Sequence, residues 1–186
     1  MELCGINLTT EHQEELDRAA YSLFVYVDKI FIIKGIYNSI DPKYKKGIAS
    51  PYLNFRDALF HYKKMYEGAI SGDNTVVLQQ SACIDEHLNR GIKDFAINLC
   101  TNCFVPVIHE MMLSQSKSVN DVVFQRLRHI YHELKNIVAE IRLGGQLLLH
   151  FDSKGVEWLP RIIIAIKAFN DLLGEYPQLR IFYTAN

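Results

Sequence analysis

Hydrophobic side chains recur three and four positions apart along most of the chain, which is the period of one face of an α-helix. The first such face follows Thr10, and Thr10 with Gln13 has the pattern of a capping box at a helix N-terminus. This helix is predicted to end at Asp41, because the residue before a proline is pushed out of the helical region. Its apolar face consists of Leu16, Ala19, Ala20, Leu23, Phe24, Val27, Ile30 and Phe31.

The same spacing predicts four more helices, with proline, glycine and serine at their ends. Pro51 suits the first turn of the second helix, and Gly72 ends that helix. The third helix carries an apolar stripe from Ile84 to Leu99 and is expected to be kinked or to end near Pro106. The other predicted helices are Ser50–Ser71, Val119–Leu143 and Val156–Leu173.

No repeat, low-complexity tract or long linker divides the chain, so residues 1–186 are predicted to form a single domain. Five helices with short connections indicate an all-α fold, an antiparallel helical bundle. The segment Leu147–Phe151 is interpreted as a short strand or an extra helical turn.

The predicted second helix is apolar on two sides. Large residues form one continuous stripe that we expect to face the core. The opposite side also carries apolar residues, with Arg56 on one flank and Asp57 and His61 on the other. A helix of this kind must bury both sides, either in the centre of the bundle or against a second subunit. The predicted core stripe is Tyr52, Phe55, Leu59, Tyr62 and Tyr66, and the opposite side carries Leu53 and Phe60.

Composition narrows the class of protein. Hydrophobic residues make up 49% and charged residues 22%, as in globular domains, and the net charge is −1. Nucleic acid would therefore have to bind a local patch. Met1–Gly5 has no signal-peptide pattern, and the most apolar stretches, Leu23–Ile36 and Arg161–Phe169, are interrupted by charge or too short for a bilayer. Without a signal peptide or a membrane span, the chain is predicted to be soluble and cytoplasmic, with no membrane association. Its four cysteines are then expected to be reduced thiols.

Several common chemistries lack their motifs. The phosphate loop, the dinucleotide-binding glycines, the zinc pair of histidines on one helix and the Glu-x-x-His of di-iron bundles do not occur. No cofactor and no metal site is therefore predicted. Cys100 and Cys103 form a single CxxC that we interpret as part of the core. His87 and the other histidines outside motifs give no signal.

The segment from Arg56 to His61, RDALFH, is the one motif in the sequence that suggests a chemical function. It resembles the signature of the HEPN superfamily, in which an arginine and a polar residue are followed after a short interval by a histidine. HEPN domains are all-α bundles of toxin–antitoxin systems, abortive-infection proteins and CRISPR-associated ribonucleases. The resemblance covers about six residues, and Tyr62 lies one residue earlier than the tyrosine of one toxin group.

The resemblance implies metal-independent RNA cleavage in a homodimer cleft where two copies of the motif meet. His61 would be the general base at a ribose 2′-OH or the general acid at the leaving oxygen. Arg56 would hold the scissile phosphate, and Asp57, four residues before His61, would orient the imidazole. The helix apolar on two sides suits a motif at a dimer seam. A protein partner or antitoxin is also expected in such a system.

A basic cluster on the predicted fourth helix is a second candidate for RNA binding. Arg128, His132 and Lys135 share one face, and Arg126 lies nearby. Such a run is also typical of a solvated basic face. The alternative to a ribonuclease is a non-enzymatic interaction module whose second helix docks a protein partner.

Overall fold

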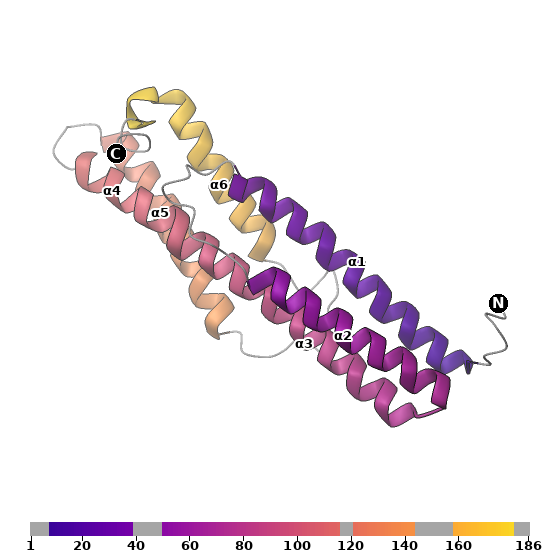
Figure 1. The fold of residues 1–186 in the computed structure, drawn as a ribbon. Coiled ribbons are helices and arrows are strands. Elements are labelled where there is room, and N and C mark those ends of the chain that lie inside the picture. The colour runs from indigo at the N-terminus through magenta and orange to yellow at the C-terminus, as the bar shows by residue number, and fades with distance from the viewer. Residues whose placement is uncertain (1–7, 39–49, 116–120, 144–157, 181–186) are drawn as a thin grey trace. The chain divides into compact units, whose positions relative to one another are not determined.

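The computed structural model describes residues 8–38, 50–115, 121–143 and 158–180. These residues are almost entirely helical and none of them lies in a strand, so the predicted all-α class is confirmed (Figure 1). The helices are α1 (Thr10–Asn38), α2 (Ser50–Ser71), α3 (Asn74–Asn98), η2 (Leu99–Phe104), α4 (Val105–Gln115), α5 (Asp121–Leu143), α6 (Trp158–Glu175) and η3 (Pro177–Arg180).

The chain divides into two compact units. Unit 1 comprises Met1–Phe31, Ala49–Asp94 and Gln146–Gly155, and so contains most of α1, all of α2 and most of α3. Unit 2 comprises Ile32–Ile48, Phe95–Gly145 and Val156–Asn186, and so contains η2, α4, α5 and α6. The single domain stays a prediction. The predicted end of the first helix at Asp41 and the segment Leu147–Phe151 lie outside the described residues.

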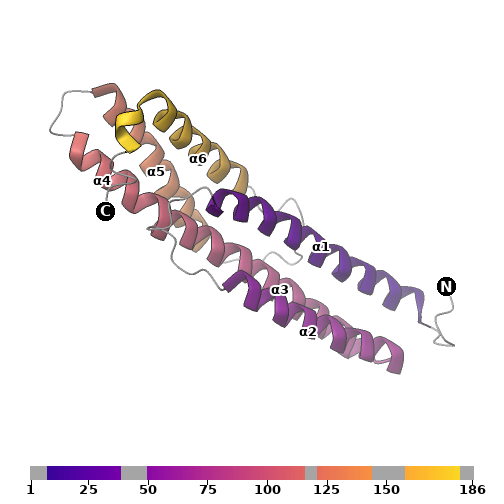
Figure 2. The same ribbon diagram turned by 45° about the horizontal axis from the view of Figure 1, so that its top comes forward.

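The ends of α2 follow the sequence signals closely. The helix runs from Ser50 to Ser71 as predicted, and Gly72 follows it with a positive φ of 74° that favours glycine. Asp73 then caps α3, because its Oδ1 accepts a hydrogen bond from the Val76 amide at 3.1 Å. The result is a tight turn between α2 and α3, visible in Figure 2.

The cap of α1 differs from the prediction by one residue. The side chain of Thr9, rather than Thr10, accepts a hydrogen bond from the His12 amide at 3.1 Å. The Gln13 side chain does not reach back to close a capping box, since it donates to Asp17 at 2.8 Å. Two successive threonines offer the same cap chemistry, so the pattern located the helix start but not its register.

The predicted break near Pro106 takes the form of a π-helical turn, after which the helix continues as α4. Proline lacks an amide proton, and its ring clashes with the carbonyl four residues earlier in an α-helix. The wider π turn just before Pro106 has hydrogen bonds to the fifth preceding residue, as Val105 makes to the Cys100 carbonyl. Cys100 and Cys103 are both buried, so their interpretation as core residues is confirmed.

Helix α3 continues through η2 into α4 as one run, Asn74–Ser114, that is long and apolar enough to cross a membrane by length and composition alone. Of the relevant window, 44% is buried inside the structure. A core helix of a soluble protein meets the same test, so this run is weak evidence for a membrane span and the fold is compatible with a soluble protein.

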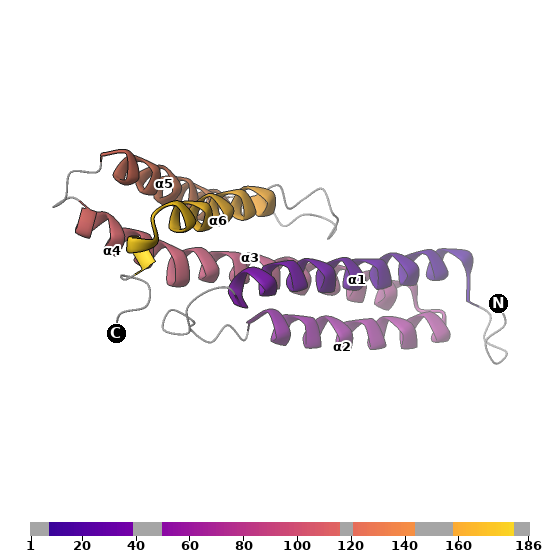
Figure 3. The same ribbon diagram turned by 90° about the horizontal axis from the view of Figure 1, so that it is seen from above.

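In unit 1, α1, α2 and α3 run side by side in the views of Figures 1 and 3. The α1 seam repeats at spacings of three and four, as in a coiled coil. Ala20, Phe24 and Phe31, which the sequence placed on this face, are exposed. The buried positions along α1 in this unit are His12, Leu16, Ala19, Ser22, Leu23, Tyr26 and Ile30.

The predicted core stripe of α2 is wrong at three of its five residues, whereas Phe55 and Tyr62 are half-buried. Tyr52, Leu59 and Tyr66 are 54%, 44% and 39% exposed, whereas Ala58 and Gly68 are buried. Small residues let the neighbouring helices approach closely: a Cβ added at Gly68 would lie 2.7 Å from a Val76 methyl group. The prediction considered only large side chains, and it therefore missed a buried face of α2 that includes small residues.

Unit 2 has a different interior. Its buried side chains are all hydrophobic among the described residues, and the rings of Phe104 and Phe169 meet edge to face with centroids 6.1 Å apart. The helices α5 and α6 lie side by side in Figure 3. The buried face of α5 consists of Val123, Leu127, Ile130, Leu134, Ile137, Val138 and Ile141.

Candidate functional site

The first two residues of the RDALFH motif form an ion pair on the surface of α2. The Nε and Nη2 atoms of Arg56 donate to Oδ1 of Asp57 at 2.9 and 2.7 Å. On an ideal helix Arg56 and His61 project about 140° apart, and Asp57 projects between them. The ion pair therefore turns the guanidinium from the outer side of α2 toward the side that carries His61.

His61 is held by α3. Its Nδ1 atom lies 2.7 Å from Oε1 of Gln80, and because an amide oxygen only accepts, the Nδ1–H donates to it. The sequence predicted that Asp57 orients this imidazole, but the hydrogen bonds assign that position to Gln80. The charge of Asp57 instead acts on the neighbouring His87, whose pKa it raises.

His87 of α3 stacks on His61, which sequence reasoning did not anticipate. The ring centroids are 5.1 Å apart and the planes differ by 25°. The Nδ1 atom of His87 lies 3.3 Å from Oδ1 of Asn54. The Asn54 amide has one orientation, because its Nδ2 donates to the Ser50 carbonyl at 2.9 Å, so the His87 Nδ1 carries the proton.

Two shifted pKa values follow from these contacts. The hydrogen bond from Arg56 lowers the pKa of Asp57, and the charges of Arg56, His87 and His61 add to the effect. Burial lowers the pKa of His87, and the positive charges of His61 and Arg90 lower it further, while Asp57 and Glu86 act in the opposite direction. Asp57 is therefore ionised and His87 neutral at neutral pH.

We call Asn54, Arg56, Asp57, His61, Gln80 and His87 the paired-histidine site. An exposed aromatic ring borders it, since Phe60 is 54% exposed and meets the His61 ring edge to face. The Lys64 ammonium lies 4.6 Å from the centroid of the Phe60 ring. Arg90 and Glu86 form an ion pair on α3.

The signal that identifies His87 is the register of the α2–α3 hairpin. A tight turn at Gly72 makes α2 and α3 antiparallel neighbours, and residues at similar distances from the turn then lie at the same level. His61 is eleven positions before Gly72 and His87 fifteen after it, a difference of about one helical turn. A single helical wheel cannot show this relation, because the two histidines lie on different helices.

The basic cluster lies on α5, in unit 2. Arg126 does not offer a free charge, because it is paired with Glu175 at the end of α6. Arg128, His132 and Lys135 are exposed, and the Lys135 ammonium lies 5.3 Å from the centroid of the Tyr131 ring. Three of the four predicted RNA-binding residues are thus free to meet solvent, and the fourth is neutralised.

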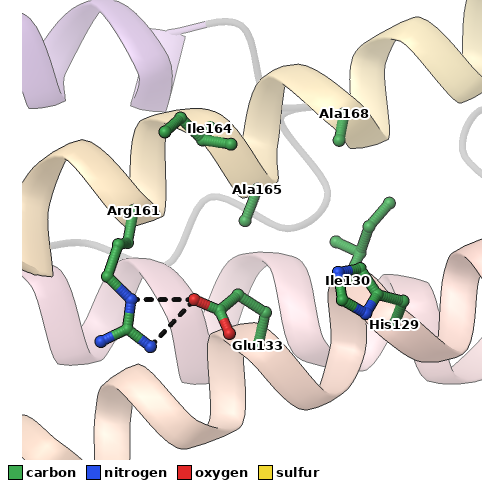
Figure 4. Close-up of a pocket in the computed structure, with 7 residues that line it drawn as sticks. All are labelled: His129, Ile130, Glu133, Arg161, Ile164, Ala165 and Ala168. Carbon is green, nitrogen blue, oxygen red and sulfur yellow. Dashed lines mark hydrogen bonds and ion pairs between the residues drawn. The ribbon is translucent and has the colours of Figure 1, made fainter.

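A groove between α5 and α6 holds two cavities, of about 180 and 280 Å³, which share His129, Ile130 and Ala168 (Figure 4). Its floor is apolar, and at one end the Arg161 guanidinium points toward Glu133, at 2.9 Å. The two charged groups at this end are thus paired with each other.

Among the described residues, no group of three or more histidine, cysteine, aspartate or glutamate side chains is arranged to hold a metal ion. Comparisons of the chain with protein-family models, curated proteins and solved structures found no match.

Proposed function

We propose that the chain is a HEPN-like, metal-independent endoribonuclease that acts in the cytoplasm, in a bacterial toxin–antitoxin or phage-defence system. The observation that supports it most is the pairing of Arg56 with Asp57 beside His61. A cation can stabilise charge on the phosphate and an imidazole can transfer protons, and both effects promote metal-independent cleavage of RNA.

In this proposal Arg56 binds a non-bridging oxygen of the scissile phosphate and stabilises the charge that develops there. The Asp57 carboxylate holds the guanidinium in place until substrate arrives. His61 exchanges a proton with the reacting oxygen through Nε2, since its Nδ1 is bonded to Gln80. The exposed members of the basic cluster, Arg128, His132 and Lys135, are the proposed contacts to the RNA backbone.

The test is cleavage of a mixed single-stranded RNA pool in the presence of EDTA. Removing a general acid or base lowers the rate by about 10²–10⁴-fold, so His61→Ala is expected to lose cleavage to that extent. Arg56→Ala is expected to lose about 10²–10³-fold. His109→Ala, which removes an exposed histidine on α4, is the matched control and is expected to cleave normally. Wild-type protein that leaves the pool intact, or an active His61→Ala variant with native circular dichroism, contradicts the proposal.

A homodimer through the outer face of α2 is the proposed assembly. The exposed residues Tyr52, Leu59 and Tyr66 are spaced by seven and are symmetric about Leu59. In an antiparallel pair of α2 helices, Tyr52 would face the partner's Tyr66 across a two-fold axis at Leu59. The same spacing makes this surface complementary to itself, which favours a second copy over an unrelated protein.

The area of this face approaches the apolar part of a dimer interface. With Ile70, its exposed parts amount to roughly 350 Å² per chain, taking about 150–250 Å² for each whole large side chain. A standard interface buries about 800 Å² per partner, of which slightly more than half is apolar. Light scattering is expected to give a dimer for the wild type and a monomer for Leu59→Glu. A monomeric wild type contradicts the proposed assembly.

The same exposed face favours the second candidate function, a non-enzymatic interaction module that docks a protein partner such as an antitoxin. The two candidates differ in what the paired-histidine site does. If Leu59→Glu abolishes binding of a partner while no variant of His61 affects any activity, the interaction module is the better account.

A further inference from the structure

His87 and His61 present the same kind of nitrogen to solvent. Each ring is anchored through Nδ1, to Asn54 and Gln80 respectively, so the Nε2 atom lies on the far side of the ring from its anchor. Among the described residues neither Nε2 atom has a hydrogen bond, and neither is completely buried. Both atoms are therefore available to a substrate.

The two rings stack closely enough for their charges to interact. Two imidazolium ions with centroids 5.1 Å apart repel each other, so the pair carries one proton more readily than two. Burial lowers the pKa of His87, so His87 is neutral at neutral pH. The charged groups that act on it are His61 and Asp57 from α2 and Glu86 and Arg90 from its own helix.

We propose that His87 is a catalytic residue that the RDALFH motif does not contain: it is the general base of the RNA cleavage, and His61 is the general acid. This inference rests on the proposed ribonuclease function. It resolves the role of His61, for which the sequence left both possibilities open. Two adjacent imidazoles can divide acid and base roles, one taking a proton and the other giving one.

The reaction balances within the substrate and the two rings. The Nε2 of neutral His87 takes the proton of a ribose 2′-OH, and the 2′ oxygen attacks the adjacent phosphorus. The bond from phosphorus to the 5′ oxygen breaks, and the Nε2–H of protonated His61 donates its proton to that oxygen. The products are a 2′,3′-cyclic phosphate and a 5′-hydroxyl, and a proton moves from His87 to His61 through solvent to reset the pair.

A structural role for His87 predicts different behaviour. If the ring only supports His61 by stacking, a flat ring without a basic nitrogen will serve as well. His87→Phe keeps such a ring and removes the base, so the structural role predicts an active variant and the catalytic role an inactive one.

The experiment compares two substrates in EDTA, an RNA dinucleotide and uridine 3′-(4-nitrophenyl phosphate). The nitrophenolate of the second leaves without protonation, so this substrate needs a base but no acid. His61→Ala is expected to lose about 10²-fold or more on the dinucleotide and less than about tenfold on the nitrophenyl ester. His87→Ala and His87→Phe are expected to lose about 10²-fold or more on both. His109→Ala is the histidine control, and circular dichroism checks that each variant folds.

The outcomes separate this inference from the proposed function. If His61→Ala is inactive on the dinucleotide while His87→Phe cleaves both substrates normally, His87 is not the base and the ribonuclease proposal stands. If the nitrophenyl ester rescues the His87 variants but not His61→Ala, the two roles are reversed and the assignment is overturned. If the wild type cleaves neither substrate, both proposals fail.

Discussion

The interiors of the two units differ in the kinds of side chain that stabilise them. Every buried polar side chain among the described residues lies in unit 1, whereas the buried side chains of unit 2 are all hydrophobic. An apolar interior gives stability with little geometric demand, and a polar seam fixes the register of its helices because each group must meet its partner. The paired-histidine site lies in unit 1, the unit whose helices are held in register by buried polar side chains. The buried polar residues are His12, Ser22, Asn54, Ser81, Asp85 and Asn89.

Arg18 is the centre of the polar seam away from the site. It donates to Asp85 of α3 at 2.8 Å, and the Asp85 side chain is only 4% exposed. Ser81 joins the same network, since it accepts from Arg18 and donates to Glu15 at 2.9 Å. Together these contacts fix the level of α3 against α1, and hence the level at which α3 carries Gln80 and His87.

The largest expected effect is in the apolar interior of unit 2. Phe169→Ala removes a ring that is 1% exposed and packs against Phe104, and is expected to lower the free energy of unfolding by about 4 kcal/mol. Phe169→Leu, which keeps most of the volume, is expected to cost about 1.5 kcal/mol or less. Urea denaturation measures both, and hydrogen exchange is expected to locate the loss in α5 and α6. Equal stability of the two variants would mean that this interior is loosely packed.

In unit 1 a buried carboxylate, Asp85, adds to the apolar core. Asp85→Ala leaves Arg18 without its main partner and is expected to destabilise unit 1 by about 3 kcal/mol. The double variant Arg18→Met with Asp85→Leu removes both charges and is expected to recover most of the loss. Urea denaturation with hydrogen exchange in α1 and α3 is the measurement. If Asp85→Ala unfolds like the wild type, the polar seam does not hold unit 1 together.

Close helix contact in unit 1 is tested by Gly91→Ala. The new Cβ would lie 2.2 Å from the Tyr26 hydroxyl and 3.0 Å from Cβ of Asn54, so a loss of about 2 kcal/mol is expected. Tyr26→Phe alone loses the hydrogen bond to the Pro51 carbonyl, about 1 kcal/mol. The double variant is expected to cost less than the sum of the two, because the hydroxyl in the way is gone. Strict additivity in thermal denaturation contradicts this close approach.

The smallest expected effect is a pH dependence confined to unit 1. Because the pKa of folded His87 is below the usual 6.5, the unfolded chain binds more protons just below that pH. The contribution of neutral His87 to the free energy of unfolding is therefore fully present above pH 6.5. It declines as the pH falls toward the pKa of His87 in the folded state. His87→Phe is expected to flatten this decline, and His109→Ala to leave it unchanged. Urea midpoints between pH 5 and 7.5 measure the slope.

Local features, such as the ends of helices, could be predicted from the sequence more completely than the contacts between helices. The ends of α2, Ser50 and Ser71, were predicted closely, because a proline and a glycine at its ends act through the backbone. The core stripe through Leu59 was wrong, because the seam depends on small residues such as Ala58 that a hydrophobic pattern does not rank. His87 was missed for a related reason, since its partners His61 and Asn54 lie on another helix.

The central claim is that the paired-histidine site cleaves RNA through the ribose 2′-OH. The most direct test incubates wild-type protein in EDTA with one RNA oligonucleotide and with the same sequence carrying 2′-deoxyribose throughout, and identifies the product ends by mass spectrometry. We expect cleavage of the RNA alone, with 2′,3′-cyclic phosphate and 5′-hydroxyl ends. Cleavage of both strands, or of neither, would contradict the account.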